Sequence, residues 1–112
     1  MKQIITHHRD KEPFENIKKG IKKMEFRLYD KKRQKIKLGQ IIKIVSRENK
    51  KDFFFVKVIG LSRFKNFDDL YEVYADKIQQ YEKDVLSRVY SKEDEKKYGI
   101  LVIHFRLVDV KI

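Results

Sequence analysis

The chain has 112 residues and no cysteine, so we expect a single domain over residues 1–112 without disulfides or thiolate metal sites. No segment approaches the roughly 18 apolar residues of a membrane span, and the first residues lack the apolar stretch of a signal peptide, which predicts a soluble cytoplasmic protein without a membrane partner. The net charge is +11, but residues 1–65 carry 20 Lys and Arg against 7 Asp and Glu, whereas residues 66–112 carry 8 against 10. This asymmetry favours a polyanion partner, nucleic acid first, and the alternative is the Lys-rich composition of an AT-biased genome.

Five segments are predicted to form strands, because they are rich in β-branched and aromatic residues or alternate between apolar and polar residues. The clearest alternation is KMEFRLY, which places Glu25, Arg27 and Tyr29 on one face of a half-buried strand. Gly60 lies inside the longest β segment, where it indicates a bulge or a corner of the kind that a barrel needs. The predicted strands are residues 3–8, 23–29, 40–46, 52–64 and 100–110.

Helix signals fall between these strands. Pro13 suits the first turn of a short helix, and Ser91 suits the N-cap of another. After the N-cap Asn66, residues 67–89 predict one long helix or two shorter helices separated near residues 75–77. The resulting order predicts an α+β fold, a small mixed β-barrel with helices packed at its ends and openings. The apolar residues at helical spacing are Leu70, Val73, Tyr74, Ile78, Tyr81, Val85 and Val89.

A candidate site lies around the alternating strand. Glu25 and Arg27 are two residues apart, so their side chains leave the same face about 6.6 Å apart and can meet one ligand. Lys22 precedes the strand among other lysines, and Tyr29 on the same face is the aromatic residue best placed to stack on a base. The alternative is a solvated strand face with ion pairs that contribute about 0 to 1 kcal/mol each.

Other kinds of site have little support in the sequence. His7 and His8 are adjacent and point to opposite faces of a strand, so they are a poor metal pair. His104 and Arg106 share a face of the last predicted strand and suit an anion-binding patch. The chain has neither a G-x-S-x-G nucleophile motif nor a glycine-rich phosphate loop. We therefore expect no metal and no cofactor.

The stretch PFENIKKGIKKMEFRLYDKKRQKIKLGQIIKI resembles the N-terminal signature of the ASCH domain, a small PUA-like β-barrel. This signature is a helix, the motif G-x-K-x-x-E-x-R, and a glycine before the next strand. LYEVY and YSKEDEKKYG resemble the small bacterial members. The resemblance implies a cleft between barrel and helices that is lined by the Lys, Glu and Arg of the motif, and an association with RNA or modified nucleosides. The matching residues are Gly20, Lys22, Glu25, Arg27 and Gly39.

The resemblance also implies a possible chemistry. Some ASCH proteins hydrolyse the amide of acetylated cytidine with a Lys and a Thr of this motif and a later Glu. Lys22 matches that Lys, whereas Glu25 occupies the Thr position. Glu72 is the nearest acidic residue to the later Glu, and Gln40 stands where an acidic residue commonly follows the glycine.

Three functions therefore stay open. In an RNA- or nucleotide-binding ASCH domain, Lys22 and Arg27 contact phosphate or carbonyl oxygens and Glu25 accepts hydrogen bonds from a base edge or a ribose hydroxyl. In a small hydrolase of amidohydrolase or ribonuclease type, Lys22 is the base and Glu25 polarises the substrate or water. A protein-interaction domain would use the helices of residues 67–89. The expected ligand contacts of the preferred, RNA-binding function are Lys22, Glu25, Arg27, Tyr29, Lys31, Lys32, Arg33 and Lys35.

Overall fold

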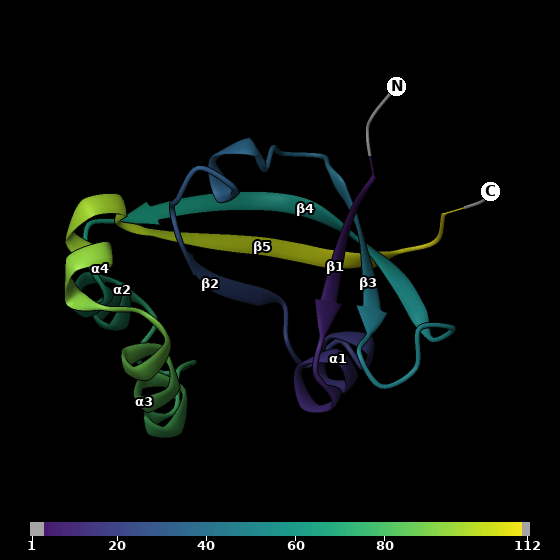
Figure 1. The fold of residues 1–112 in the computed structure, drawn as a ribbon, viewed down its shortest axis with the longest axis horizontal. Coiled ribbons are helices and arrows are strands. Elements are labelled where there is room, and N and C mark those ends of the chain that lie inside the picture. Colours follow the sequence, from purple (N-terminus) through teal and green to yellow (C-terminus); the bar gives the residue numbers. More distant parts are fainter. Residues whose placement is uncertain (1–3, 111–112) are drawn as a thin grey trace. The chain divides into compact units, whose positions relative to one another are not determined.

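The structure is a computed structural model that describes residues 4–110, and these residues form a five-stranded sheet and four α-helices (Figure 1). The strand order is β1-β3-β4-β5-β2, with β1 parallel to β3 and β3 antiparallel to β4. The predicted α+β fold is confirmed. The elements are β1 (Ile5–Arg9), α1 (Lys11–Lys18), β2 (Met24–Leu28), the 3-10 turn η1 (Arg33–Lys35), β3 (Ile41–Ser46), β4 (Phe53–Phe64), α2 (Phe67–Val73), α3 (Gln80–Val89), α4 (Lys92–Tyr98) and β5 (Ile100–Val108).

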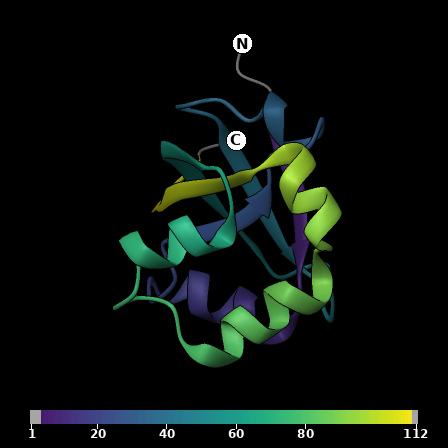
Figure 2. The same cartoon turned by 90° about the vertical axis from the view of Figure 1, so that its left-hand side faces the viewer.

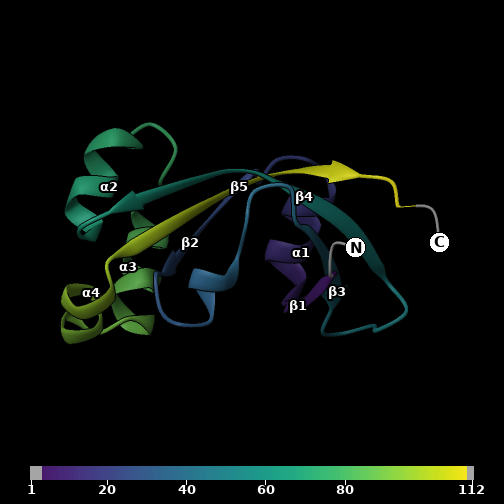
Figure 3. The ribbon, with the colours of Figure 1, turned by 90° about the horizontal axis from the view of Figure 1, so that it is seen from above.

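The chain forms two compact units. The strand unit contains β1, α1 and β3, and the helical unit contains α2, α3 and α4. Strands β2, β4 and β5 run through both, and Figure 3 shows β4 and β5 side by side, as neighbours in the sheet. Among the described residues, the strand unit comprises 4–25, 36–61 and 103–110, and the helical unit comprises 26–35 and 62–102.

One face of the strand unit's sheet carries its core. The parallel register pairs His7 with Ile44, and the antiparallel register pairs Ile44 with Phe54, so these side chains point to the same side. Helix α1, which contains Pro13 in its first turn as predicted, lies against this face, and the fully buried Phe14 places its ring 5.0 Å from that of Phe54 (Figure 1). We call this side the inner face, and by alternation it holds Ile5, His7, Arg9, Ile42, Ile44, Ser46, Phe54, Val56 and Val58.

In the helical unit, residues 67–89 form two shorter helices and not one long helix, which confirms the second of the two predicted alternatives. Helix α2 begins after Asn66, whose Oδ1 accepts a hydrogen bond from the Asp69 N–H at 2.8 Å, as the predicted N-cap requires. It ends at Val73, and α3 begins at Gln80, so two helices replace a single long one (Figure 2). Helix α4 begins after Ser91, whose hydroxyl accepts the Asp94 N–H at 3.1 Å.

The apolar spacing of residues 67–89 predicts burial correctly at Leu70, but not at Val73 of α2, which is 63% exposed, nor in α3. Leu70 is fully buried, and the ring of Tyr74 lies 6.3 Å from Phe26 and 5.9 Å from Phe64. By contrast, helix α3 contains no buried residue, and three of its apolar side chains are between 44% and 63% exposed. These exposed side chains are Tyr81, Val85 and Val89.

Glycines end α1 and α4 in conformations with positive φ. Gly20 has φ +75°, and a Cβ added there would meet nothing within 4 Å. Gly99 has φ +72° and ψ −173°, and a Cβ added there would lie 3.0 Å from the backbone oxygen of Phe64. This combination of φ and ψ at Gly99 lies in a region that essentially only glycine occupies. Of these two positions, Gly99 alone combines an unfavourable backbone conformation with a steric clash.

We predict that Gly99→Ala lowers the free energy of unfolding by about 3 kcal/mol, whereas Gly20→Ala lowers it by about 1 kcal/mol. The difference arises because only the Gly99 variant must also move the Phe64 carbonyl. Urea denaturation followed by circular dichroism measures both values. Equal losses would contradict the steric role assigned to Phe64.

Candidate functional site

The central residue of the motif, Glu25, is buried. It is only 4% exposed, although it alternates with Phe26, which is also buried, along β2. Both faces of the strand are therefore covered at this point. The expectation of a half-buried strand, and the alternative of a solvated polar face, are wrong for Glu25.

Arg9 holds the buried carboxylate of Glu25. Its Nε donates to Glu25 Oε1 at 2.7 Å and its Nη2 donates to Oε2 at 2.6 Å, and the two side chains are 13% and 5% exposed. Arg9 Nη2 also lies 3.3 Å from His7 Nδ1, and Nη1 donates to the His8 carbonyl at 2.8 Å. Two parallel charge-assisted hydrogen bonds fix the plane of the carboxylate and balance its charge.

Sequence reasoning missed Arg9. Its position follows from the strand pairing, because β1 pairs in parallel with β3 and Arg9 lies opposite Ser46 on the inner face. The Arg47 N–H donates to the Arg9 carbonyl at 3.0 Å, which fixes the end of β1. The signal in the sequence is the alternation of THHR, in which His7 and Arg9 share the face of the β-branched core residues.

His104 is a further polar residue of the strand unit that points to the inner face. A Cβ added to Gly60 would lie 3.2 Å from the Cβ of His104, so the two residues face each other across neighbouring strands. Strand β4 runs through Gly60, and the missing side chain makes room for the imidazole. By alternation along β4, this position has the same orientation as Val58 and the rest of the inner face.

The other two charged motif residues lie in different units. Lys22 is half-buried in the strand unit, directly after α1, and its N–H donates to the Asn16 carbonyl at 3.0 Å. Arg27 is half-buried in the helical unit, and its Nη1 donates to the Phe26 carbonyl at 2.8 Å. The structure therefore places Lys22 and Glu25 in the strand unit and Arg27 in the helical unit.

Tyr29 and the basic turn belong to the helical unit. The Arg63 guanidinium lies 3.8 Å from the centre of the Tyr29 ring, so one face of the ring that was expected to stack on a ligand is already covered. Arg33 Nη1 pairs with Asp30 at 3.0 Å, which balances its charge locally. Three expected contacts of this turn are exposed and form no ion pair within residues 4–110: Lys31, Lys32 and Lys35.

The helical unit contains one buried acidic residue with a structural role, Glu95. Glu95 is 7% exposed and accepts the Phe67 N–H at 2.9 Å, so it caps the first turn of α2 from a distant segment. Burial raises the pKa of Tyr71, and the charges of Glu95 and Asp68 raise this pKa further. Glu72, the acidic residue considered for catalysis, is exposed on α2.

Two further features are absent from the part of the chain that the structure describes. No group of three or more His, Asp or Glu side chains gathers there closely enough to hold a metal ion. No helix there has the length and apolar character that crossing a membrane requires.

The five-stranded sheet with its four helices is an α+β fold of PUA-like type. The chain belongs to the ASCH domain family, whose profile matches residues 8–109 and so covers both units. No curated protein matches the chain.

Solved structures agree with this assignment. The hypothetical protein PH0355 is 32% identical with a TM-score of 0.75, over 95% of this chain and 100% of that one. The solution structure of PF0455 from Pyrococcus furiosus is 29% identical with a TM-score of 0.72, over 96% and 100%. An ASCH domain from Lactobacillus crispatus is 14% identical with a TM-score of 0.68, over 93% and 79%, and shows the shared fold.

We predict that Arg9→Met lowers the free energy of unfolding by about 3 kcal/mol, because it removes two hydrogen bonds from a buried carboxylate. The matched control is Arg47→Met, since Arg47 pairs with Asp10 at the surface with side chains 59% and 71% exposed. This exposed pair contributes at most about 1 kcal/mol.

Thermal and urea unfolding measure both variants. The double variant Arg9→Met/Glu25→Leu should recover part of the loss, because it leaves no buried charge. A loss for Arg9→Met no larger than that for Arg47→Met would contradict the structural role of the buried pair.

Proposed function

We propose that this protein is an RNA- or nucleotide-binding ASCH domain that acts in the cytoplasm, with residues 1–112 working as one domain. The observation that carries the proposal is the cluster of exposed lysines in the basic turn, Lys31, Lys32 and Lys35, which form no ion pair within the described residues 4–110. Cations of this kind attract a phosphate backbone and release its counterions. Membership of the ASCH family and the concentration of charge in residues 1–65 support the same partner.

The Arg9–Glu25 pair makes an acidic residue compatible with a phosphate ligand. Arg9 balances the charge of the Glu25 carboxylate, so the pair adds no net negative charge to repel a polyanion. In this proposal Glu25 accepts a hydrogen bond from a base edge or a ribose hydroxyl, while Lys22 and Arg27 contact phosphate or carbonyl oxygens.

The salt dependence of binding tests the polyanion part of the proposal. If five phosphates of a single-stranded decanucleotide are contacted, the logarithm of the affinity falls with the logarithm of the salt concentration at a slope of about −3.5. Fluorescence anisotropy between about 50 and 200 mM salt measures this slope. An affinity that does not change with salt would overturn the proposal.

The basic turn is tested by replacing its three lysines. We predict that Lys31→Ala/Lys32→Ala/Lys35→Ala reduces the magnitude of the salt slope by about 2, because three phosphate contacts are lost. The control is Lys11→Ala/Lys50→Ala/Lys51→Ala, which removes the same charge from exposed positions of the strand unit. Equal effects of the two triple variants would show that only net charge matters.

The hydrolase alternative uses the same motif and is tested with the same protein. Acetylated and otherwise modified nucleosides are incubated with the wild type and with Lys22→Ala, and products are separated by chromatography. We expect binding without turnover. Turnover that disappears in Lys22→Ala would replace the binding proposal by the hydrolase, with Lys22 as its base.

A further inference from the structure

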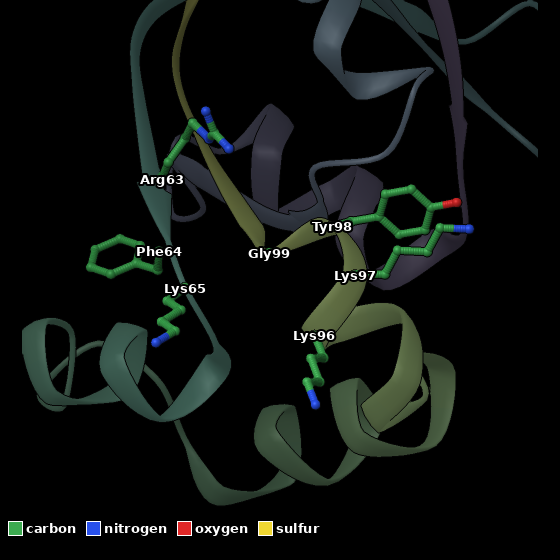
Figure 4. A pocket seen from close by; sticks show the side chains of 7 residues that line it. All are labelled: Arg63, Phe64, Lys65, Lys96, Lys97, Tyr98 and Gly99. Carbon is green, nitrogen blue, oxygen red and sulfur yellow. The ribbon is translucent and has the colours of Figure 1, made fainter.

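The helical unit contains a second basic site that does not include the motif residues. A pocket of about 370 Å³ lies where the end of β4 meets the junction of α4 and β5 (Figure 4). The pocket is largely open to solvent. Four of its seven lining residues are cations and none is acidic. The lining residues are Arg63, Phe64, Lys65, Lys96, Lys97, Tyr98 and Gly99.

The backbone around Gly99 brings the basic side chains of two segments together. The Tyr29 N–H donates to the Gly99 carbonyl at 2.9 Å, and a Cβ at Gly99 would touch the Phe64 carbonyl, so the end of β4 lies directly beside Gly99. Figure 4 shows Lys65 and Lys96 extending to the same side of Gly99 from these two segments. Glycine at this position therefore allows the end of β4 to approach the junction of α4 and β5 this closely.

Arg63 is partly positioned before any ligand binds. Its guanidinium lies 3.8 Å from the centre of the Tyr29 ring. A cation held over an aromatic ring at this distance keeps its positive charge while its position is restricted. Since Tyr29 is itself fixed by its hydrogen bond to Gly99, the same contacts organise Arg63 and the pocket floor.

The surrounding charges point to an anionic ligand. Lys96 and Lys97 lie in the last turn of α4, where cations stabilise the negative end of the helix. The negative end of α4 explains the positions of Lys96 and Lys97, but it does not explain Arg63 and Lys65, which lie at the end of β4. The nearest acidic residue in sequence, Glu95, is buried and its charge is already used: Oε1 accepts the Phe67 N–H at 2.9 Å and Oε2 lies 3.6 Å from Lys92 Nζ.

We propose that this pocket binds a phosphodiester group of the RNA chain. The inference rests on the proposed RNA-binding function and adds a phosphate contact that the ASCH motif does not contain. Lys65 and Lys96, which extend to the same side of Gly99 from two segments of the chain, neutralise the phosphate (Figure 4). The Arg63 guanidinium extends to the other side of Gly99 in this view, so it adds positive charge to the site without contacting the same phosphate. The contact carries no base specificity, because phosphate oxygens are the same at every nucleotide.

The test is Lys65→Ala/Lys96→Ala, and the matched control is Lys50→Ala/Lys51→Ala, which removes two exposed lysines of the strand unit that do not line the pocket. Binding of a single-stranded RNA decanucleotide with a 5′-hydroxyl end is measured as a function of salt. We expect the pocket variant to lose about tenfold in affinity and about 0.7 to 1.4 in the magnitude of the salt slope. We expect the control to stay within about twofold of the wild type.

The possible outcomes separate the two proposals. If the wild type binds RNA and both double variants behave alike, the pocket proposal is overturned while the RNA-binding function stands. If the wild type binds no RNA, the proposed function is overturned, and the pocket proposal, which rests on it, is overturned as well.

Nuclear magnetic resonance titrations with inorganic phosphate, a nucleoside monophosphate and the decanucleotide identify the source of the phosphate. We expect the decanucleotide to shift the Gly99 amide signal in the wild type, and to shift it less in Lys65→Ala/Lys96→Ala. A shift with inorganic phosphate or the monophosphate but none with the decanucleotide would overturn the assignment to a phosphodiester.

Discussion

The ion pair between Arg9 and Glu25 joins the two strands that lie at opposite ends of the sheet order. Arg9 is on β1 and Glu25 is on β2, which are the first and last strands of β1-β3-β4-β5-β2. The pair therefore links residues at the two ends of this order within the strand unit. Because the pair is buried, its desolvation is compensated only by close bidentate geometry, which the distances of 2.6 and 2.7 Å provide.

Several acidic residues have structural partners. Glu25 is balanced by Arg9, Asp30 pairs with Arg33, and Glu95 accepts the Phe67 N–H. The exposed lysines at the turn of residues 31–37 and around the pocket at Gly99 belong to the chain's excess of 28 Lys and Arg over 17 Asp and Glu. This excess of positive charge is the basis of the proposed RNA binding.

Local patterns predicted the elements well. Alternation located β2, β-branched runs located β4 and β5, and the caps Asn66 and Ser91 located the starts of α2 and α4. These signals involve neighbours within one or two turns, so the sequence carries them directly. The apolar residues of α3 show the limit, because helical spacing indicates which side chains share a face and not whether anything covers that face.

By itself, the sequence determined the strands, the helix starts after Asn66 and Ser91, the family motif and the concentration of cations in residues 1–65. Only the tertiary structure decided which of many cations pairs with Glu25, and that Arg63 stacks on Tyr29 beside a pocket. Arg9 and Glu25 are separated by 16 residues, so their contact depends on strand pairing and order. The physical reason is that alternation indicates the direction of a side chain, whereas its partner depends on segments that are distant in the chain.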